Sequence, residues 1–274
     1  MPTAFLNFKN SSSQLHALDV SKYDETFVAK SIRQRMEEEH CHSIGEYFDL
    51  VEKCKQEEIN LLDSLQISYS LFFRNSFTFS VLETHILPTL IQRNKEQNRK
   101  ELRIWSAACA AGQEAYSLAI LLEEYNATHS EKINYRIFAT DQSEIQLQKA
   151  RKGQYDFSAL GHVSLKSAKT FFTKKENIYS VRKVLKNNID FSAFNLFDEQ
   201  LSSPPSSVFG DFDLVVCANL LFYYKPPFRK IILKKIKQNL SAGGYLVTGE
   251  TEREILLQHG FLEVFPQSAI FRNK

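Results

Sequence analysis

A buried strand that runs through small residues into a helix constrains the fold of this chain more than any other feature. Leu102–Leu122 reads LRIWSAACAAGQEAYSLAILL. Ile104 and Trp105 are typical of a buried strand, and the apolar residues at the end of the stretch repeat with helical spacing. Between them, alanines and Gly112 let the backbone approach a ligand closely. We interpret the stretch as the strand, turn and helix of a nucleotide-binding α/β sheet.

The turn in this stretch is not of the phosphate-binding kind. It lacks the Gly-Lys-Ser/Thr ending that holds a triphosphate, and Glu114 stands where it would repel an anionic ligand. A ligand with a cationic end is favoured, and S-adenosylmethionine, which carries an ammonium and a sulfonium, is the common one. The alternative for Glu114 is an acid placed in the first helical turn because the helix dipole stabilises it there.

A second acid follows the next predicted strand. Tyr135, Ile137 and Phe138 form the apolar part of that strand, which ends at Asp141. Ligands of open α/β sheets bind at the carboxyl ends of the strands, where Asp141 can accept hydrogen bonds from both ribose hydroxyls. The same order of turn and acid occurs in dinucleotide-binding folds, and the local alternative for Asp141 is an N-cap of a helix that starts near Ser143.

Composition and charge set the broad class of protein. The 274 residues are 43% hydrophobic, which suits one sizeable globular domain together with a smaller one. The formal net charge of +2 creates no global field, so we expect no nucleic-acid partner.

Cysteine usage and targeting signals indicate the compartment. Cys41, Cys54, Cys109 and Cys217 form no CxxC pair, which is typical of a reducing cytoplasm. His40–His42 reads as a polar turn, so no metal is expected. The sequence shows neither a signal peptide nor an apolar run of transmembrane length, so we expect a cytoplasmic protein with no direct membrane insertion.

Two domains are expected along the chain. Residues 23–36, 43–55 and 57–65 place apolar residues at helical spacing, which predicts an all-helical N-terminal domain over 1–67. The α/β domain is expected over 68–274. Its later strands are predicted at 212–217, 245–248, 261–264 and 269–272, with a helix at 227–240 before the second of them.

An edge hairpin is also predicted within the α/β domain. Residues 178–184 and 188–192 read as two short strands that pair with each other on the edge of the sheet. They define a hairpin insertion of about 176–192.

Ordered blocks over most of the chain resemble one known family, the chemotaxis-receptor glutamate O-methyltransferases of the CheR type. WSAACAAGQEAYS is close to the family's WSAxCxxGEEPYS, and ATD and FNL match without change. VCANLLFYY is similar to FCRNVLIYF, and SLFFRN to the block Thr-x-Phe-Phe-Arg-Asp. The blocks in chain order are Asp19–Met36, Ser70–Asn75, Trp105–Ser117, Ala139–Asp141, Phe194–Leu196 and Val216–Tyr224.

The resemblance implies a fold and a function. The fold is a Rossmann-like class I methyltransferase sheet with a small helical N-terminal domain and a short β-hairpin insertion. The function is methyl transfer from S-adenosylmethionine to glutamate carboxylates of chemotaxis receptors, which gives methyl esters and S-adenosylhomocysteine during sensory adaptation. The implied partners are the cytoplasmic helices of methyl-accepting receptors, and we expect a monomer.

The resemblance also implies site residues by position. Arg74 and Tyr223 would face the reacting groups as catalytic residues. Lys30, Arg33 and Arg35 form a solvated basic face or, as a hypothesis, meet an acidic receptor helix. The residues that would line the donor site are Ser68, Ser70, Arg74, Ala107, Glu114, Asp141, Asn195, Leu196, Ala218 and Asn219.

Several of these positions depart from the family pattern. Ala218 replaces an arginine and so lacks a bidentate donor and a positive charge, and Gln113 replaces the first glutamate. Alternatives therefore stay open: a methyltransferase of the same fold with another protein or small-molecule acceptor, or a donor-binding regulatory module with weak turnover. Further departures are Ser68 for Asn, Asn75 for Asp, Ala115 for Pro, and Gly249–Glu252 for the family's Gly-x-Ser-Glu.

Overall fold

The computed structural model describes residues 20–65, 70–207 and 209–273. Within it the chain groups into two compact units. One consists of Met1–Ile67 together with Phe222–Arg229, and the other of Ser68–Leu221 together with Lys230–Lys274. Among the described residues, no helix combines the length and the apolar character needed to cross a membrane.

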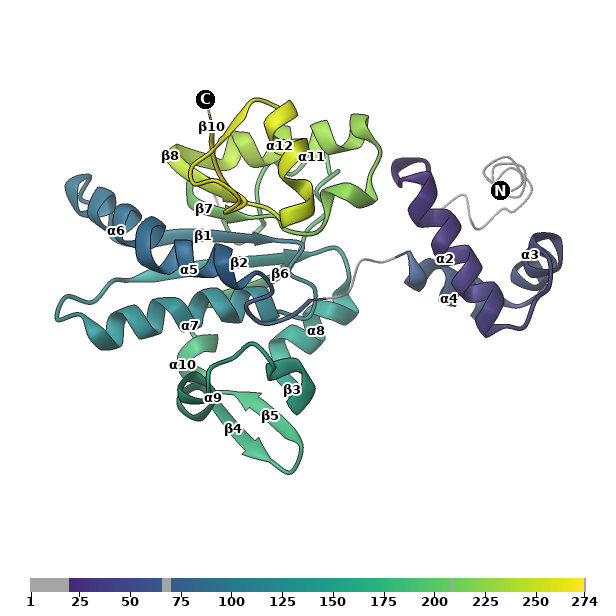
Figure 1. Cartoon of the computed structure of the whole chain (residues 1–274), viewed down its shortest axis with the longest axis horizontal. Coiled ribbons are helices and arrows are strands. Elements are labelled where there is room, and N and C mark those ends of the chain that lie inside the picture. Colours follow the sequence, from purple (N-terminus) through teal and green to yellow (C-terminus); the bar gives the residue numbers. More distant parts are fainter. Residues whose placement is uncertain (1–19, 66–69, 208, 274) are drawn as a thin grey trace. The chain divides into compact units, whose positions relative to one another are not determined.

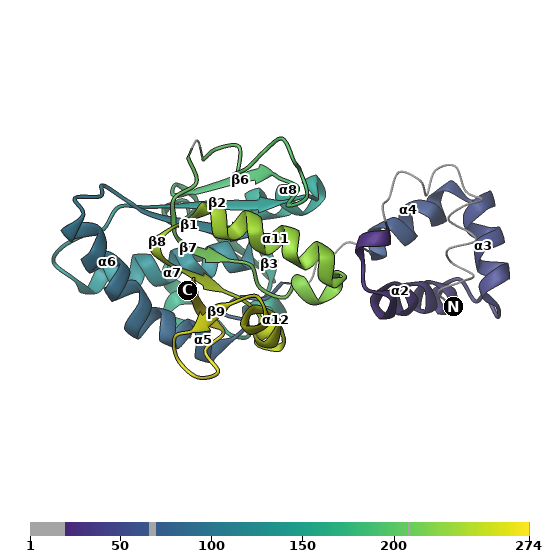
Figure 2. The same ribbon diagram turned by 90° about the horizontal axis from the view of Figure 1, so that it is seen from above.

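The first unit is helical, as its apolar spacing predicts (Figure 2). Asp24 caps α2 (Glu25–Glu38) by accepting from the Thr26 amide at 2.9 Å, and Ser43 caps α3 (Ile44–Lys53) by accepting from the Glu46 amide at 3.2 Å. The elements are η2 (Val20–Lys22), α2 (Glu25–Glu38), α3 (Ile44–Lys53) and α4 (Lys55–Ser64).

A buried carboxylate joins the helices of this unit. Glu57, only 2% exposed, accepts from Arg35 Nε at 2.9 Å and from the Tyr47 hydroxyl at 2.7 Å. Arg35 also pairs with Glu38 and Glu39, and its side chain is 12% exposed. The prediction that Arg35 belongs to an open basic face was therefore wrong, because this guanidinium neutralises a buried acid from α4.

The second unit is built on a twisted sheet with the strand order β6-β2-β1-β7-β8-β10-β9 (Figure 1). Strands β6, β2, β1, β7 and β8 are parallel to their neighbours, and β10 pairs antiparallel with β8 and β9. The strands are β1 (Leu102–Ala107), β2 (Tyr135–Asp141), β6 (Ile189–Ala193), β7 (Phe212–Val216), β8 (Leu240–Val247), β9 (Phe261–Glu263) and β10 (Ile270–Asn273).

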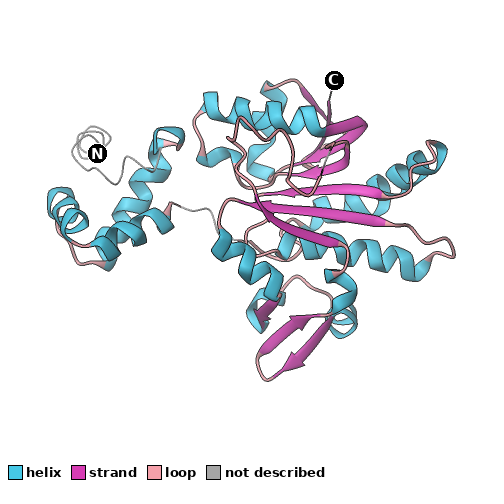
Figure 3. Ribbon diagram, turned by 180° about the vertical axis from the view of Figure 1, so that it is seen from behind, coloured by secondary structure: helices cyan, strands magenta, loops and turns pink. Residues whose placement is uncertain are grey.

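Helices cover both faces of this sheet, with α7 on one side and α11 and α12 on the other (Figures 1 and 3). Strand β7 is buried along its whole length and is apolar apart from Asp213, as expected for a central strand that is covered on both faces. The helices are α5 (Ser76–Val81), η3 (Leu82–Ile86), α6 (Leu87–Glu96), α7 (Gln113–Thr128), α8 (Glu144–Lys152), η5 (Leu221–Tyr223), α11 (Pro226–Asn239), η6 (Glu250–Glu252) and α12 (Arg253–Gln258).

A smaller sheet with the strand order β3-β5-β4 corrects the predicted hairpin. The segment 178–184 does not pair with 188–192. Instead β5 pairs antiparallel with β4 and β3, and β6 is the parallel edge strand of the main sheet. A two-residue turn that begins at Glu176, with φ 55°, joins β4 to β5 without the usual glycine. The elements are β3 (Gln154–Asp156), η4 (Phe157–Leu160), α9 (Leu165–Phe171), β4 (Phe172–Lys175), β5 (Ile178–Val181) and α10 (Lys183–Lys186).

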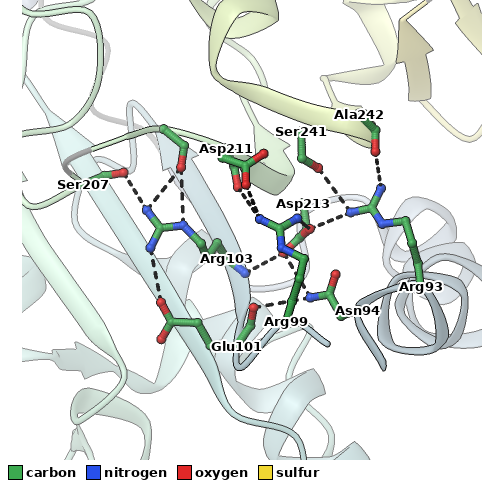
Figure 4. A network of polar contacts seen from close by, with 11 residues as sticks. Arg93, Asn94, Arg99, Glu101, Arg103, Ser207, Asp211, Asp213, Ser241 and Ala242 are labelled. Atoms are coloured by element: carbon green, nitrogen blue, oxygen red, sulfur yellow. Dashed lines mark hydrogen bonds and ion pairs between the residues drawn. The ribbon is translucent and has the colours of Figure 1, made fainter. Parts of the chain in front are cut away.

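At the amino end of β7, a fully buried carboxylate ties neighbouring elements together (Figure 4). Asp213 accepts from Arg93 at 2.5 Å, from Arg99 at 2.7 Å and from the Arg103 backbone amide at 2.9 Å. Arg93 also donates to Ser241 in β8 at 3.2 Å. These contacts fix α6, β1, β7 and β8 at the sheet edge opposite to the carboxyl ends of the strands.

Candidate donor-binding site

The carboxyl ends of β6, β2, β1 and β7 lie at one edge of the sheet because these neighbouring strands are parallel. The chain leaves β1 toward β2 and enters β7 on the other side of β1, so the strand order reverses there, which is where open α/β sheets bind ligands. This edge brings together the predicted donor residues Ala107, Glu114, Asp141, Asn195, Leu196, Ala218 and Asn219.

The loop after β1 has an unusual backbone. Ala108, Ala110 and Gly112 have φ values of 63°, 47° and 91°, in the left-handed region that favours glycine. The Cys109 amide donates to the Thr140 carbonyl at 2.8 Å, which turns the loop back over the end of β2. Small side chains keep this strained loop compact, and α7 begins directly after it.

Asp141 supports that loop from β2. Its Oδ2 accepts from the Ala110 amide at 2.8 Å, and its Oδ1 accepts from the Ser143 amide at 2.9 Å. Burial raises the pKa of Asp141, and these backbone hydrogen bonds oppose the rise. The contact with Ser143 closes a local turn and is not the expected helix cap, because α8 begins at Glu144 with Ser143 as its N-cap residue.

Glu114 lies in the first turn of α7 and is partly exposed. Ser106 Oγ, from β1, donates to Glu114 Oε1 at 2.6 Å. Burial raises the pKa of Glu114 to about 7, while the Ser106 hydrogen bond and the positive charge of Arg74 oppose the rise. A carboxyl with this pKa releases its proton readily when a cation binds beside it.

The segment that carries Ser70 and Arg74 is attached to α7. The Phe73 amide donates to Ser117 Oγ at 3.0 Å, and Asn75 caps α5 by accepting from the Thr78 amide at 3.1 Å. Asparagine is as good a helix N-cap as aspartate, so Asn75 can replace the aspartate of the family pattern at this position. Arg74 is exposed, and its charge acts on Glu114. Ser68 lies outside the described residues.

The residues after β6 form a turn at the same edge. Asn195 Oδ1 accepts from the Phe197 amide at 2.9 Å, so the asparagine stabilises its own turn. Asn195 is exposed and Leu196 is half-buried.

The residues after β7 are held by an acid that the sequence analysis did not select. Asn219 is left-handed, with φ 59°, and its backbone amide donates to Glu252 Oε2 at 2.7 Å. Glu252 has no exposed surface. The available signal was the fourth residue of Gly249–Glu252, which keeps the family's glutamate although the third residue differs.

Tyr223 groups with the helical unit. Its carbonyl accepts from the Asp24 amide at 2.8 Å, and its ring meets Phe27 edge-on at 4.6 Å between ring centroids. The neighbouring Tyr224 stacks on Tyr23 at 5.1 Å. The loop that carries Tyr223 is thus fixed to the start of α2.

The strand order and the acids at this edge are those of a Rossmann-like fold that binds a nucleoside-containing ligand, and the family matches identify it as a methyltransferase that uses S-adenosylmethionine. Residues 68–267 match the family model described as CheR methyltransferase, SAM binding domain, and residues 4–65 match the CheR methyltransferase, all-alpha domain. The chain belongs to the CheR methyltransferase family. The predictions of fold, donor and enzyme class are confirmed.

Named relatives agree with this assignment. Chemotaxis protein methyltransferase 1 of Pseudomonas aeruginosa is 34% identical over 233 residues, which cover 82% of this chain and 81% of the relative. Chemotaxis protein methyltransferase Cher2 of Pseudomonas putida is 30% identical, with 82% and 81% covered. A chemotaxis protein methyltransferase of Listeria monocytogenes is 30% identical, with 86% and 84% covered.

The residues at the edge fit the methyl donor. Glu114 and Asp141 supply carboxylates for a cationic end and for hydroxyls, and the alanine loop leaves the backbone accessible. The Oε1 atom of Gln113 is buried and has no hydrogen-bond partner among the described residues, so it can accept a hydrogen bond from a ligand. Those residues contain no cluster of three or more His, Cys, Asp or Glu side chains suited to a metal ion.

Proposed function

We propose that this enzyme methylates glutamate side chains in the cytoplasmic helices of chemotaxis receptors, with the donor bound at the carboxyl edge of the sheet. The observation that carries the acceptor is the match to the CheR methyltransferase models over both parts of the chain. The donor part of the proposal is supported by the geometry of Glu114, a half-buried acid in the first turn of α7 that accepts a hydrogen bond from Ser106 of β1. Such an acid favours a ligand that brings positive charge. The donor residues named above are proposed in that role.

Orientation is the main chemical task of this site. The donor, when bound, supplies a methyl group on a positively charged sulfur. A glutamate acceptor is ionised at neutral pH, so its attack needs no general base. Holding two reactants at near-attack distance can contribute about 7–11 kcal/mol. We assign Arg74 to orient the acceptor carboxylate, because a guanidinium makes planar, paired hydrogen bonds to carboxylates.

Tyr223 is the second proposed catalytic residue, carried over from the family resemblance. Its backbone is fixed by the Asp24 amide, so its position depends on the start of α2. We propose that it forms a hydrogen-bonding wall beside the methyl group.

The exposed basic residues Lys30 and Arg33 are proposed to meet the receptor helix. Both lie on α2, and a helix rich in glutamates would complement their charge. Arg35 is excluded from this role because it pairs with Glu57.

An assay of methyl esters tests the proposal. Purified enzyme with radiolabelled donor and receptor-containing membranes should give base-labile methyl esters on the receptor. Titration calorimetry with S-adenosylhomocysteine measures donor-site binding separately. Donor binding with methyl ester on another target would show that the acceptor is not a receptor. Donor binding without any methyl ester would indicate a regulatory module. We also propose that the protein is cytoplasmic and monomeric. Light scattering tests the oligomeric state, since a monomer has a mass of 31.7 kDa.

A further inference from the structure

Glu252 is a carboxylate with no exposed surface, close to the donor edge but outside the set of predicted site residues. It ends the short η6 turn that follows β8. Burying a carboxylate is costly unless hydrogen bonds replace its lost water. The hydrogen bonds of Glu252 therefore indicate which parts of the fold this carboxylate stabilises.

Those contacts join the loops after two neighbouring strands. Oε2 accepts from the Asn219 amide at 2.7 Å, and Oε1 accepts from the Leu221 amide at 2.5 Å, both on the loop after β7. Oε2 also accepts from the Gly249 amide and the Thr248 hydroxyl, both at 2.8 Å, on the loop after β8. Glu252 thus holds the carboxyl ends of β7 and β8 together.

The geometry of the clamped loop depends on this acid. Asn219 is left-handed, with φ 59°, a conformation that a non-glycine residue keeps only when its surroundings hold it. Gly249 closes the other side, since a Cβ there would lie 2.9 Å from Asn219 Oδ1 and 2.9 Å from Glu252 Oε2. Asn219 is therefore fixed between Glu252 and Gly249.

We propose that Glu252 is a positioning residue that sets the shape of the loop Ala218–Leu221 for binding the methyl donor. The proposal rests on the donor site proposed above, because Ala218 and Asn219 act there. Ala218 has no polar side-chain atom with which to contact a ligand. The loop Ala218–Leu221 therefore contributes to donor binding chiefly through its backbone and Asn219. Its contribution depends on the loop keeping its conformation.

An electrostatic effect gives this role a second signature. The negative charge of Glu252 raises the pKa of Glu114, while Arg74 lowers it. The thiols of Cys109 and Cys217 also interact with these acids, but burial raises their pKa values well above the ordinary range, so they stay neutral. Removing the charge of Glu252 should therefore move the titration of Glu114 to lower pH.

The test compares Glu252→Gln and Glu252→Ala with the control Glu263→Gln. Glu263 accepts from Arg253 at 2.6 and 2.7 Å and from the Ala269 amide at 3.0 Å, so it is also a bonded acid near the carboxyl terminus. Calorimetry with S-adenosylhomocysteine gives the dissociation constant, and hydrogen exchange reports on residues 217–221.

We expect Glu252→Gln to weaken binding about tenfold and Glu252→Ala about a hundredfold, as hydrogen bonds to a charged acceptor are lost. Exchange in 217–221 should rise, and the pH dependence of binding should shift downward. Glu263→Gln should change none of the three: affinity, exchange in 217–221 and the pH dependence of binding. A folded Glu252→Gln protein with wild-type affinity and wild-type exchange would overturn the proposal. Donor binding by the wild type without receptor methylation would instead count against the proposed acceptor alone.

Discussion

Ser106 Oγ donates a hydrogen bond of 2.6 Å to Glu114 Oε1, joining the end of β1 to the first turn of α7. This contact holds a carboxyl whose pKa is raised to about 7 by burial at the edge where the donor is proposed to bind. Small changes of pH around neutrality therefore change the charge of the proposed donor site.

Donor affinity should rise with pH until Glu114 is ionised. Below a pH of about 7 the free enzyme carries a proton that a cationic ligand must displace. The affinity for S-adenosylhomocysteine should fall by at most about tenfold per pH unit below that value. Calorimetry at several pH values checks this. Glu114→Gln should bind weakly at every pH, and an equally steep profile in that variant would assign the titration to another group.

The same carboxyl should affect stability in the opposite direction. Its folded pKa, about 7, lies above the ordinary value of 4.5, so the folded state binds more protons between these values. The contribution of Glu114 to the free energy of unfolding should therefore decrease as pH rises through this window. Urea unfolding of wild type and Glu114→Gln across that range measures it. A difference between the two proteins that stays constant with pH would contradict it.

Asp141→Ala should weaken binding of both the donor and its demethylated product by one to a few kcal/mol, roughly the value of hydrogen bonds to a charged acceptor. Part of the loss comes from the Ala110 amide, which loses its acceptor and no longer fixes the loop. Asp190→Ala is the control, because that acid lies on the edge strand β6 and pairs with Arg136 of β2. Unchanged affinity in Asp141→Ala would remove Asp141 from the donor site.

Arg74→Ala should lower methyl transfer strongly while leaving stability near the wild-type value, because this arginine is exposed. Arg74→Lys should restore activity only in part, since lysine lacks the planar fork. Initial rates with receptor as acceptor and a melting curve measure both effects. Arg136→Ala, which removes an exposed partner of Asp190, serves as the control. Wild-type turnover in Arg74→Ala would rule out its orienting role.

Charge reversal at Lys30 and Arg33 should raise the apparent KM for receptor, more at low salt than at high salt, because solvated charges are screened. Donor affinity should stay the same. The control is reversal of the exposed Lys53 and Lys55, at the end of α3 and the start of α4. Normal receptor methylation by the first variant at low ionic strength would place recognition elsewhere.

How far the sequence predicts this protein depends on whether a feature is local. The strand and helix of Leu102–Leu122 and the acid that ends β2 follow from patterns within a few residues, and parallel pairing then brings Glu114 and Asp141 to one edge. The helices of the first unit follow from apolar spacing for the same reason.

Only the tertiary structure decided the features that depend on partners distant in the sequence. The pairing of β5 with β4 uses a turn without glycine, and Arg35 turns inward because Glu57 of another helix needs a counter-ion. The role of Glu252 depends on contacts with the loops after β7 and β8, which only the folded chain brings together around it. Propensity and periodicity act over neighbouring residues, whereas the compensation of a buried charge is settled through space.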